Sequence, residues 1–161
     1  MVTSFKEYLE RQNQIYFSFL ALPLVLYPVV YLPLKDHALK AAEDSTTDLI
    51  YYLVAIFLLA TGYIGRRLYS NNLTRIDINW PWEEKLKHYR IASMALYGLG
   101  LLLSLVSIAL LWLTRHQLFV AVYPVLLLLI SFYRPTVSRI EKELPMSDQE
   151  LTMIKKMGKK N

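Results

Sequence analysis

Cysteine is absent from the 161-residue sequence, and glycine is scarce, with five residues scattered along the chain. The lack of thiols excludes disulfides, thiolate metal sites, iron–sulfur clusters and cysteine nucleophiles. The glycines form no phosphate-binding loop, and there is no HExxH metal motif. The three histidines, His37, His88 and His116, lie far apart in polar segments. No residue pattern therefore indicates a cofactor, a metal centre or an enzymatic reaction.

Charged residues are also scarce: they make up 19% of the chain, and 55% of it is hydrophobic. About a quarter of a typical soluble domain is charged, and the mean hydropathy here is positive, +0.29. The formal net charge of +5 would suggest nucleic-acid binding in a soluble protein. The basic residues are instead grouped between long apolar runs, so we expect no nucleic-acid partner.

Four long runs carry no charge at all. A helix rises about 1.5 Å per residue, so about 20 residues cross a hydrocarbon core of about 30 Å. The first and third runs are long enough by themselves, whereas the second and fourth depend on flanking residues that enter the interface. A soluble protein would need more polar sequence than this chain has to cover four such runs. The pattern therefore predicts spans at residues 15–34, 49–65, 91–113 and 118–133.

Lysine and arginine are distributed unevenly around these spans. Fifteen of the 18 lie in the N-terminal segment, the loop between spans two and three, and the tail at residues 134–161. Positively charged loops stay in the cytoplasm, so we expect both termini to be cytoplasmic. The sequence thus predicts one all-α domain over residues 1–161, a four-transmembrane-helix bundle with short cytoplasmic helical extensions.

Local signals define these extensions. Ser4 and Glu7 form one capping box and Ser147 and Glu150 another, which predicts helices that start near Phe5 and near Ser147. Only four residues separate spans three and four, so these two should form a tight antiparallel hairpin. Further helical segments are expected at residues 66–73, 83–90, 147–157 and 135–143, the last as a short helix or as an extension of span four.

Two tryptophans, Trp80 and Trp82, lie just before span three. Paired tryptophans near a span are typical of interfacial anchors. A nucleotide-stacking site is the alternative interpretation of the same pair.

Small residues recur on one side of spans two and three. Helices in lipid associate where small side chains let their backbones approach closely. Counted at 100° per residue, the small residues of each span fall on one face. This predicts plain packing inside the bundle or, alternatively, an oligomer seam or polar path. The candidate seam residues are Gly62, Gly65, Ser93, Gly100, Ser104 and Ser107.

Span one contains Pro23, Pro28 and Pro33. An interior proline removes a backbone hydrogen bond and tends to kink a helix. We therefore expect a kinked structural helix or, alternatively, a broken helix of the kind that forms transporter sites. None of the four runs contains a charged residue, which argues against a proton-coupled antiporter.

Four arginines lie at the cytoplasmic ends of the predicted spans: Arg66, Arg67, Arg90 and Arg134. In a compact bundle they would form a basic ring at headgroup level, and such pockets bind anionic lipid headgroups or phosphates. The alternative is that they only follow the positive-inside rule.

Three stretches carry a resemblance to known sequences: Lys-Leu-Lys-His-Tyr-Arg-Ile-Ala-Ser at residues 85–93, Arg-Pro-Thr at 134–136, and Leu-Pro-Met-Ser-Asp-Gln-Glu at 144–150. On these short motifs the chain resembles a group of uncharacterised small four-span integral membrane proteins of Bacteroidetes-type bacteria, and the similarity covers most of its length. A departure is the pair Tyr97 and Gly98, where that group carries more polar or acidic character. The resemblance implies a bacterial inner (plasma) membrane and no particular activity.

These observations predict a non-enzymatic structural or accessory subunit of a membrane assembly. Its expected partners are the lipid bilayer, including anionic lipids, and a membrane protein or a second copy of the chain. The alternative is a small oligomeric channel or transporter, lined by the prolines of span one and the serines of span three. A third hypothesis is an interfacial enzyme that acts on lipid, with Glu83, Glu84 and His88 as acid–base candidates.

Overall fold

The computed structural model describes residues 5–36, 39, 46–147 and 150–152. Within these residues, all elements of regular secondary structure are helices. The all-α prediction is confirmed. The predicted capping box at Ser4 and the predicted helix beyond residue 152 lie outside the described residues. The helices are α1 (Phe5–Lys35), α2 (Thr46–Leu73), α3 (Trp82–Thr114), α4 (Leu118–Ser131) and α5 (Val137–Glu143), followed by a helical turn at residues 150–152.

Three of these helices, α1, α2 and α3, are long and apolar enough to cross a membrane. The fourth, α4, is apolar but has only 14 residues. Its length is about 21 Å at 1.5 Å per residue, compared with about 30 Å for a hydrocarbon core. The structure thus supports a multi-pass membrane protein in which three of the four predicted spans reach the full length by themselves.

Helix α1 is continuous through Pro23, Pro28 and Pro33. From Phe5, its first described residue, it runs directly into the first predicted span. Membrane helices tolerate interior prolines because neighbouring groups and local adjustments satisfy the freed carbonyls. The prolines therefore do not divide α1 into two half-helices.

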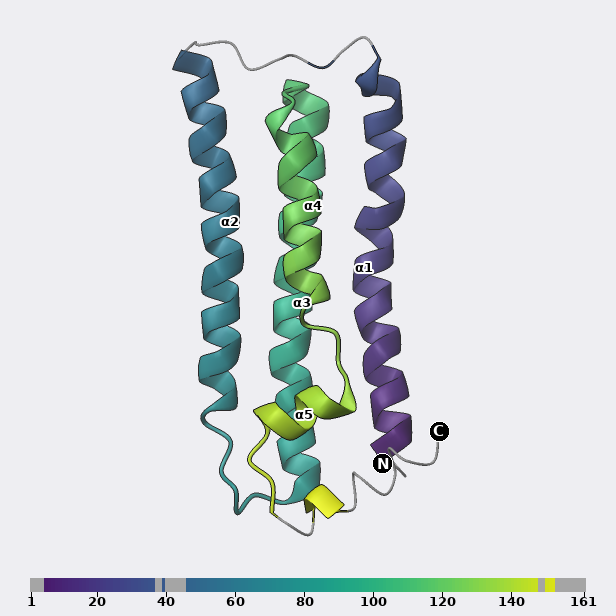
Figure 1. Cartoon of the computed structure of the whole chain (residues 1–161), viewed down its shortest axis with the longest axis vertical. Coiled ribbons are helices and arrows are strands. Elements are labelled where there is room, and N and C mark those ends of the chain that lie inside the picture. Colours follow the sequence, from purple (N-terminus) through teal and green to yellow (C-terminus); the bar gives the residue numbers. More distant parts are fainter. Residues whose placement is uncertain (1–4, 37–38, 40–45, 148–149, 153–161) are drawn as a thin grey trace.

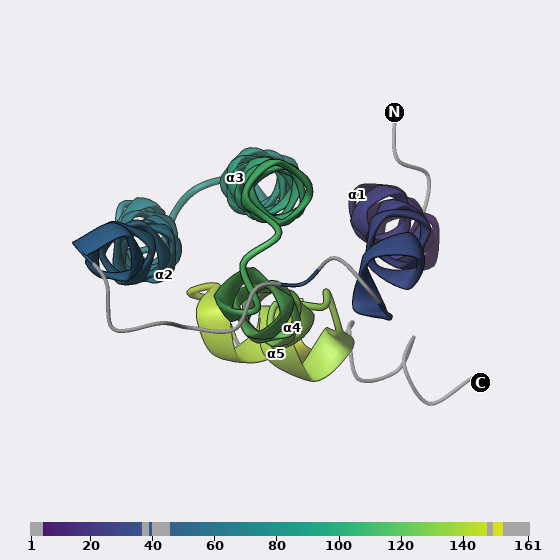
Figure 2. The same ribbon diagram turned by 90° about the horizontal axis from the view of Figure 1, so that it is seen from above.

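Helix α3 lies at the centre of the fold, and α1, α2 and α4 pack against it. Figure 1 shows the four helices side by side, and the view from above in Figure 2 places α1 and α2 on opposite sides of α3. Contacts join α3 to α1, α2 and α4, and α4 also contacts α2. Because α1 and α2 face outward on opposite sides, each keeps a broad apolar surface.

The molecule has two contrasting ends. At the α5 end, the start of α1, the end of α2 and the start of α3 meet α5 (Figure 1). At the hairpin end, the start of α2 lies near the turn between α3 and α4. A buried apolar cluster joins the segments of the α5 end, with Phe5, Tyr69, Leu86 and Ile140 among its members. The last described segments of the chain therefore pack onto the same end as its first helix turn.

The turn between α3 and α4 is as tight as the sequence predicts. Helix α3 ends at Thr114 and α4 begins at Leu118. Between them, Arg115 has a φ of 56°, and its backbone N–H donates to the Leu111 carbonyl at 2.8 Å. A left-handed residue commonly ends a helix, but the position is usually glycine because a side chain is strained there.

The structure also settles how α4 continues. Residues 132–136 lie outside any helix, so α5 is a separate helix and not an extension of α4. The Thr136 hydroxyl caps α5 by accepting the Arg139 N–H at 3.3 Å. The predicted capping box further along the tail is confirmed: the Ser147 N–H donates to Glu150 Oε2 at 2.8 Å, and the Glu150 N–H donates back to Ser147 Oγ at 3.4 Å.

Candidate functional site

The small residues of α2 and α3 lie in contacts between helices of the same chain. A methyl group added at Gly65 would collide with Leu99 of α3, and one added at Gly100 would lie 2.6 Å from Ile130 of α4. These two glycines therefore permit the close approach of α2 to α3 and of α3 to α4. The three candidate serines are also buried: Ser93, Ser104 and Ser107.

Gly62 and Gly100 both line a cavity of about 470 Å³ between α2, α3 and α4. Its volume is within the range of small-molecule binding pockets. A Cβ atom at Gly62 would meet Leu103 at 3.7 Å, which is an ordinary van der Waals distance. Gly62 therefore has room for a larger side chain, whereas Gly65 and Gly100 do not. The apolar lining includes Leu96, Leu99, Leu103, Leu126, Leu129 and Ile130.

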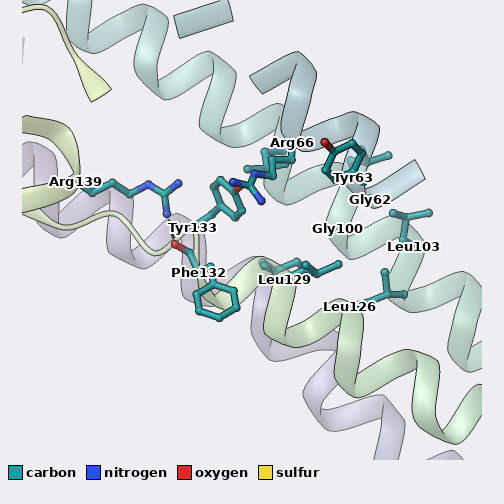
Figure 3. A pocket seen from close by; sticks show the side chains of 13 residues that line it. Gly62, Tyr63, Arg66, Gly100, Leu103, Leu126, Leu129, Phe132, Tyr133 and Arg139 are labelled. Atoms are coloured by element: carbon teal, nitrogen blue, oxygen red, sulfur yellow. Dashed lines mark hydrogen bonds between the residues drawn. The ribbon is translucent and has the colours of Figure 1, made fainter. Parts of the chain in front are cut away.

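Two arginines lie at one end of this pocket. Arg66 comes from α2 and Arg139 from α5, and Figure 3 shows both on the side of Tyr133, away from Leu103. A neighbouring hollow of about 600 Å³ shares these two arginines and adds Lys142. The pocket therefore has an apolar body and a cationic mouth.

Arg139 is held in place by three contacts. Its Nε donates to Glu143 Oε1 at 2.8 Å, its Nη1 donates to the Phe132 carbonyl, and its guanidinium lies 4.2 Å from the centroid of the Tyr133 ring. Burial alone would lower the pKa of Arg139, but the hydrogen bond and charge of Glu143 outweigh burial and raise the pKa above its usual value. Arg139 is thus a permanent cation with a defined orientation.

Glu143 also connects α5 to α2. While Oε1 accepts from Arg139, Oε2 accepts from the Tyr69 hydroxyl at 2.7 Å. Ile140, on the same short helix, is completely buried in the cluster at the α5 end. These contacts fix α5 beside the pocket and so determine where Arg139 lies.

Arg66 is bound less tightly. Its side chain is exposed, and it forms no ion pair with any other described residue. The mouth of the pocket therefore combines one oriented cation, Arg139, with one whose charge is not compensated locally.

Of the four arginines predicted to form a ring, only Arg66 lines the pocket. Arg67 is exposed beside it on α2 and does not line the pocket. Arg134 lies 5.3 Å from the centroid of the Phe17 ring on α1, and Arg90 is half-buried on α3. The structure therefore does not bring these four residues together at one site.

Arg139 was missed by the sequence analysis. Two signals could have indicated its role: Thr136 three residues before it as a helix cap, and Glu143 four residues after it as an ion-pair partner. Both signals are local and show that α5 forms, but neither shows that α5 folds back toward α2.

Both tryptophans pack on the buried cluster at the α5 end. The Trp82 ring lies 5.7 Å from that of Phe5, and the Trp80 ring lies 4.8 Å from that of His88. Their positions at the start of α3 are compatible with the predicted role as interfacial anchors, which stays a prediction.

Lys85, at the start of α3, is buried and forms an ion pair with a partly exposed carboxylate. Lys85 is 1% exposed, and its Nζ lies 3.0 Å from Oε2 of Glu150, whose side chain is 20% exposed. Burial would raise the pKa of Glu150, but the hydrogen bonds from Ser147 and Lys85 outweigh it and hold the pKa below its usual value. The pair fastens the tail to the α5 end, and the sequence analysis did not predict it.

A second buried polar pair lies at the hairpin end. His116 Nε2 lies 3.2 Å from Asp48 Oδ1 at the start of α2. The Leu118 N–H donates to His116 Nδ1 at 3.3 Å, so Nδ1 acts as an acceptor and Nε2 carries the proton that Asp48 accepts. This pair therefore joins a neutral imidazole to a carboxylate.

Several hydroxyl groups inside the helix bundle lack a hydrogen-bond partner among the described residues. The hydroxyls of Ser104 and Ser107 on α3 and of Tyr123 on α4 are buried and unpaired. The Gly100–Ile130 approach sets the antiparallel register and places Ser107 level with Tyr123. Three unpaired hydroxyls therefore lie within two otherwise apolar helices, and the Tyr123 ring stacks on that of Tyr27 of α1, with centroids 4.2 Å apart.

The described residues contain no group of three His, Asp or Glu side chains that could hold a metal ion. No family model matches the chain, and the comparisons with curated proteins and with solved structures gave no match. Any function must therefore be argued from the chain's own geometry.

Proposed function

We propose that this chain is a non-enzymatic structural or accessory subunit of an assembly in a bacterial inner membrane, with both termini in the cytoplasm. The observation that carries the proposal is the pair of outward apolar flanks on α1 and α2. Val29 on α1 is 63% exposed and Phe57 on α2 is 68% exposed. Because α1 and α2 lie on opposite sides of α3 (Figure 2), the two flanks face different neighbours in the membrane.

The α5 end gives these flanks a common base. There the buried cluster, the Lys85–Glu150 pair and the Glu143–Tyr69 hydrogen bond join α1, α2, α3, α5 and the tail. A common base with outward helices suits a subunit that presents apolar helix faces to a membrane protein or to a second copy of the chain.

Site-specific photo-crosslinking in native membranes tests this role. A photoreactive residue placed at Val29 or Phe57 should give an adduct of discrete protein mass. Leu102, on the exposed face of α3, is a matched position outside both flanks. Lipid adducts alone at all three positions, or a protein adduct at Leu102 alone, would overturn the proposal.

A small channel or transporter is the second candidate, favoured by the unpaired hydroxyls of Ser104, Ser107 and Tyr123. Buried polar groups within membrane helices often mark a path for ions or solutes. Flux into liposomes that contain the purified chain tests this function. A path past these hydroxyls requires that Ser104→Leu abolishes flux, and the idea fails if flux is absent or unaffected by the change.

A further inference from the structure

We propose that the cavity between α2, α3 and α4 is a binding site for one anionic amphiphile. Its apolar chain would occupy the pocket beside Gly62 and Leu103, and its phosphate or carboxylate headgroup would lie between Arg66 and Arg139. This inference does not depend on the accessory role, because the pocket is formed entirely within one chain.

The apolar half of the site is suited to a chain-like group. Gly62 lines the cavity without filling it, and leucines of three helices surround the space. Burial of a hydrocarbon chain among such side chains is favourable because it removes apolar surface from water. A purely polar ligand would gain nothing from this part of the pocket.

The charged half of the site is suited to an anionic oxygen group. Arg139 is oriented by Glu143, the Phe132 carbonyl and the Tyr133 ring, so little conformational freedom is lost when it binds. A guanidinium presents paired N–H donors that match carboxylate and phosphate oxygens. Glu143 accepts from Nε and the Phe132 carbonyl accepts from Nη1, so the remaining guanidinium N–H groups are the ones that would bind a ligand.

The balance of charge at the mouth indicates the ligand's charge. Glu143 compensates Arg139, whereas Arg66 has no ion-pair partner among the described residues. Lys142 lies at the adjoining hollow and adds a further positive charge. An anionic headgroup would therefore be preferred over a zwitterionic one with the same chain.

The positions of the two arginines also agree with an amphiphile in a membrane. Arg66 directly follows the uncharged run of α2, and Arg139 lies on α5, beyond the end of α4. Basic pockets at this level between membrane helices bind anionic headgroups. The apolar pocket extends from the arginines toward the middle of the helices, the direction in which an acyl chain runs.

Binding of three probes to the purified full chain tests the proposal. Dodecyl phosphate carries both chain and anion, dodecylphosphocholine carries the same chain with a zwitterionic headgroup, and inorganic phosphate carries only the anion. We expect one dodecyl phosphate per chain in native mass spectra, with affinity at least tenfold above that of either other probe. If dodecylphosphocholine bound as tightly as dodecyl phosphate, the proposed role of the arginines would be wrong. If inorganic phosphate bound as tightly as dodecyl phosphate, the proposed role of the apolar pocket would be wrong.

Two adjacent arginines provide a matched pair of variants. Arg66→Gln should weaken dodecyl phosphate binding about tenfold or more, whereas Arg67→Gln, one residue away and outside the pocket, should leave binding unchanged. Both side chains are exposed, so neither change threatens folding. Equal effects of the two variants would show attraction to general positive charge and would overturn the site.

A pocket-filling variant tests the position of the chain. Gly62→Leu should weaken dodecyl phosphate binding by filling the cavity. Gly62→Ala, whose methyl group meets only ordinary contacts, should fold normally and have a smaller effect in the same direction. Unchanged binding in a folded Gly62→Leu protein would overturn the assignment.

Discussion

The two ends of the molecule are each fastened by a polar pair between residues far apart in the sequence, but the pairs differ in charge and in the segment that they fasten. At the α5 end, Lys85 and Glu150 are 65 positions apart, and the pair fixes a tail that follows the last long helix. At the hairpin end, the carboxylate of Asp48 accepts from a neutral His116, beside a turn that is already closed by its own backbone. The α5 end therefore depends on its ion pair far more than the hairpin end depends on its hydrogen bond.

The largest expected effect follows from Glu150→Gln. The change leaves the Lys85 ammonium buried without a counter-charge, and breaking a buried pair in this way destabilises by about 3 kcal/mol. Thermal unfolding in detergent and amide exchange of residues 144–152 measure it. The double variant Lys85→Met/Glu150→Gln should recover most of the loss. If Glu150→Gln were as stable as the wild type, the α5 end would not depend on its ion pair more than the hairpin end depends on its hydrogen bond.

Acid should destabilise the α5 end by protonating Glu150 and so removing its ion pair with Lys85. Because the pKa of Glu150 is lowered in the folded chain from its ordinary value of 4.5, the stabilisation is complete above that pH. It is lost as the pH falls through the lower pKa of the folded state. The protection of the tail amides against exchange, corrected for the intrinsic pH dependence of exchange, should therefore fall below about pH 4.5, and the Glu150→Gln variant should lack this acid step. A tail whose exchange is equally pH-dependent in both proteins would contradict the assignment.

A smaller effect is expected from Asp48→Ala at the hairpin end. The His116 Nε2–H would lose its acceptor in a buried position, which costs about 1–3 kcal/mol. Thermal unfolding measures the loss. Asp36→Ala is the control, because Asp36 is an exposed acid that follows the last residue of α1 at this end. If Asp48→Ala proved more damaging than Glu150→Gln, the comparison of the ends would be reversed.

The smallest expected effect is an increase in the free energy of unfolding. Arg115 is the one described non-glycine residue with a positive φ, and Arg115→Gly should relieve strain at the end of α3. We expect a stabilisation of about 1 kcal/mol. A rise in the unfolding temperature checks it, with Gln117→Gly, which replaces a residue of right-handed φ, as the destabilising counterpart.

Much of the fold follows from local patterns in the sequence. Uncharged runs located the long helices, and the predicted extensions at residues 66–73 and 83–90 are continuous with α2 and α3. A capping signal located the second box at Ser147. The segment at residues 135–143 was expected as a short helix or as an extension of span four, and the structure shows the separate helix α5 there. These features depend on neighbouring residues alone, so they can be predicted without knowledge of the tertiary structure.

The candidate site was less predictable, because it depends on the rotation of each helix about its axis. Adjacent residues on a helix point about 100° apart, so Arg66 can line the pocket while Arg67 does not. A count of positive charges in each loop does not show in which direction each side chain points. The partnership of Lys85 with Glu150 was equally hidden, because it results from the way the tail folds back across the α5 end.

Helix α4 is much shorter than its neighbour α3, with 14 residues beside 33. Lipid that touches its exposed side chains, such as Leu128, meets an apolar length of about 21 Å, whereas a typical hydrocarbon core measures about 30 Å. Such a hydrophobic mismatch is relieved when the bilayer thins locally, at a modest cost for each ångström. The protein would therefore deform the membrane on one side only and concentrate where the bilayer is already thin, so that bilayer thickness itself would influence where it resides.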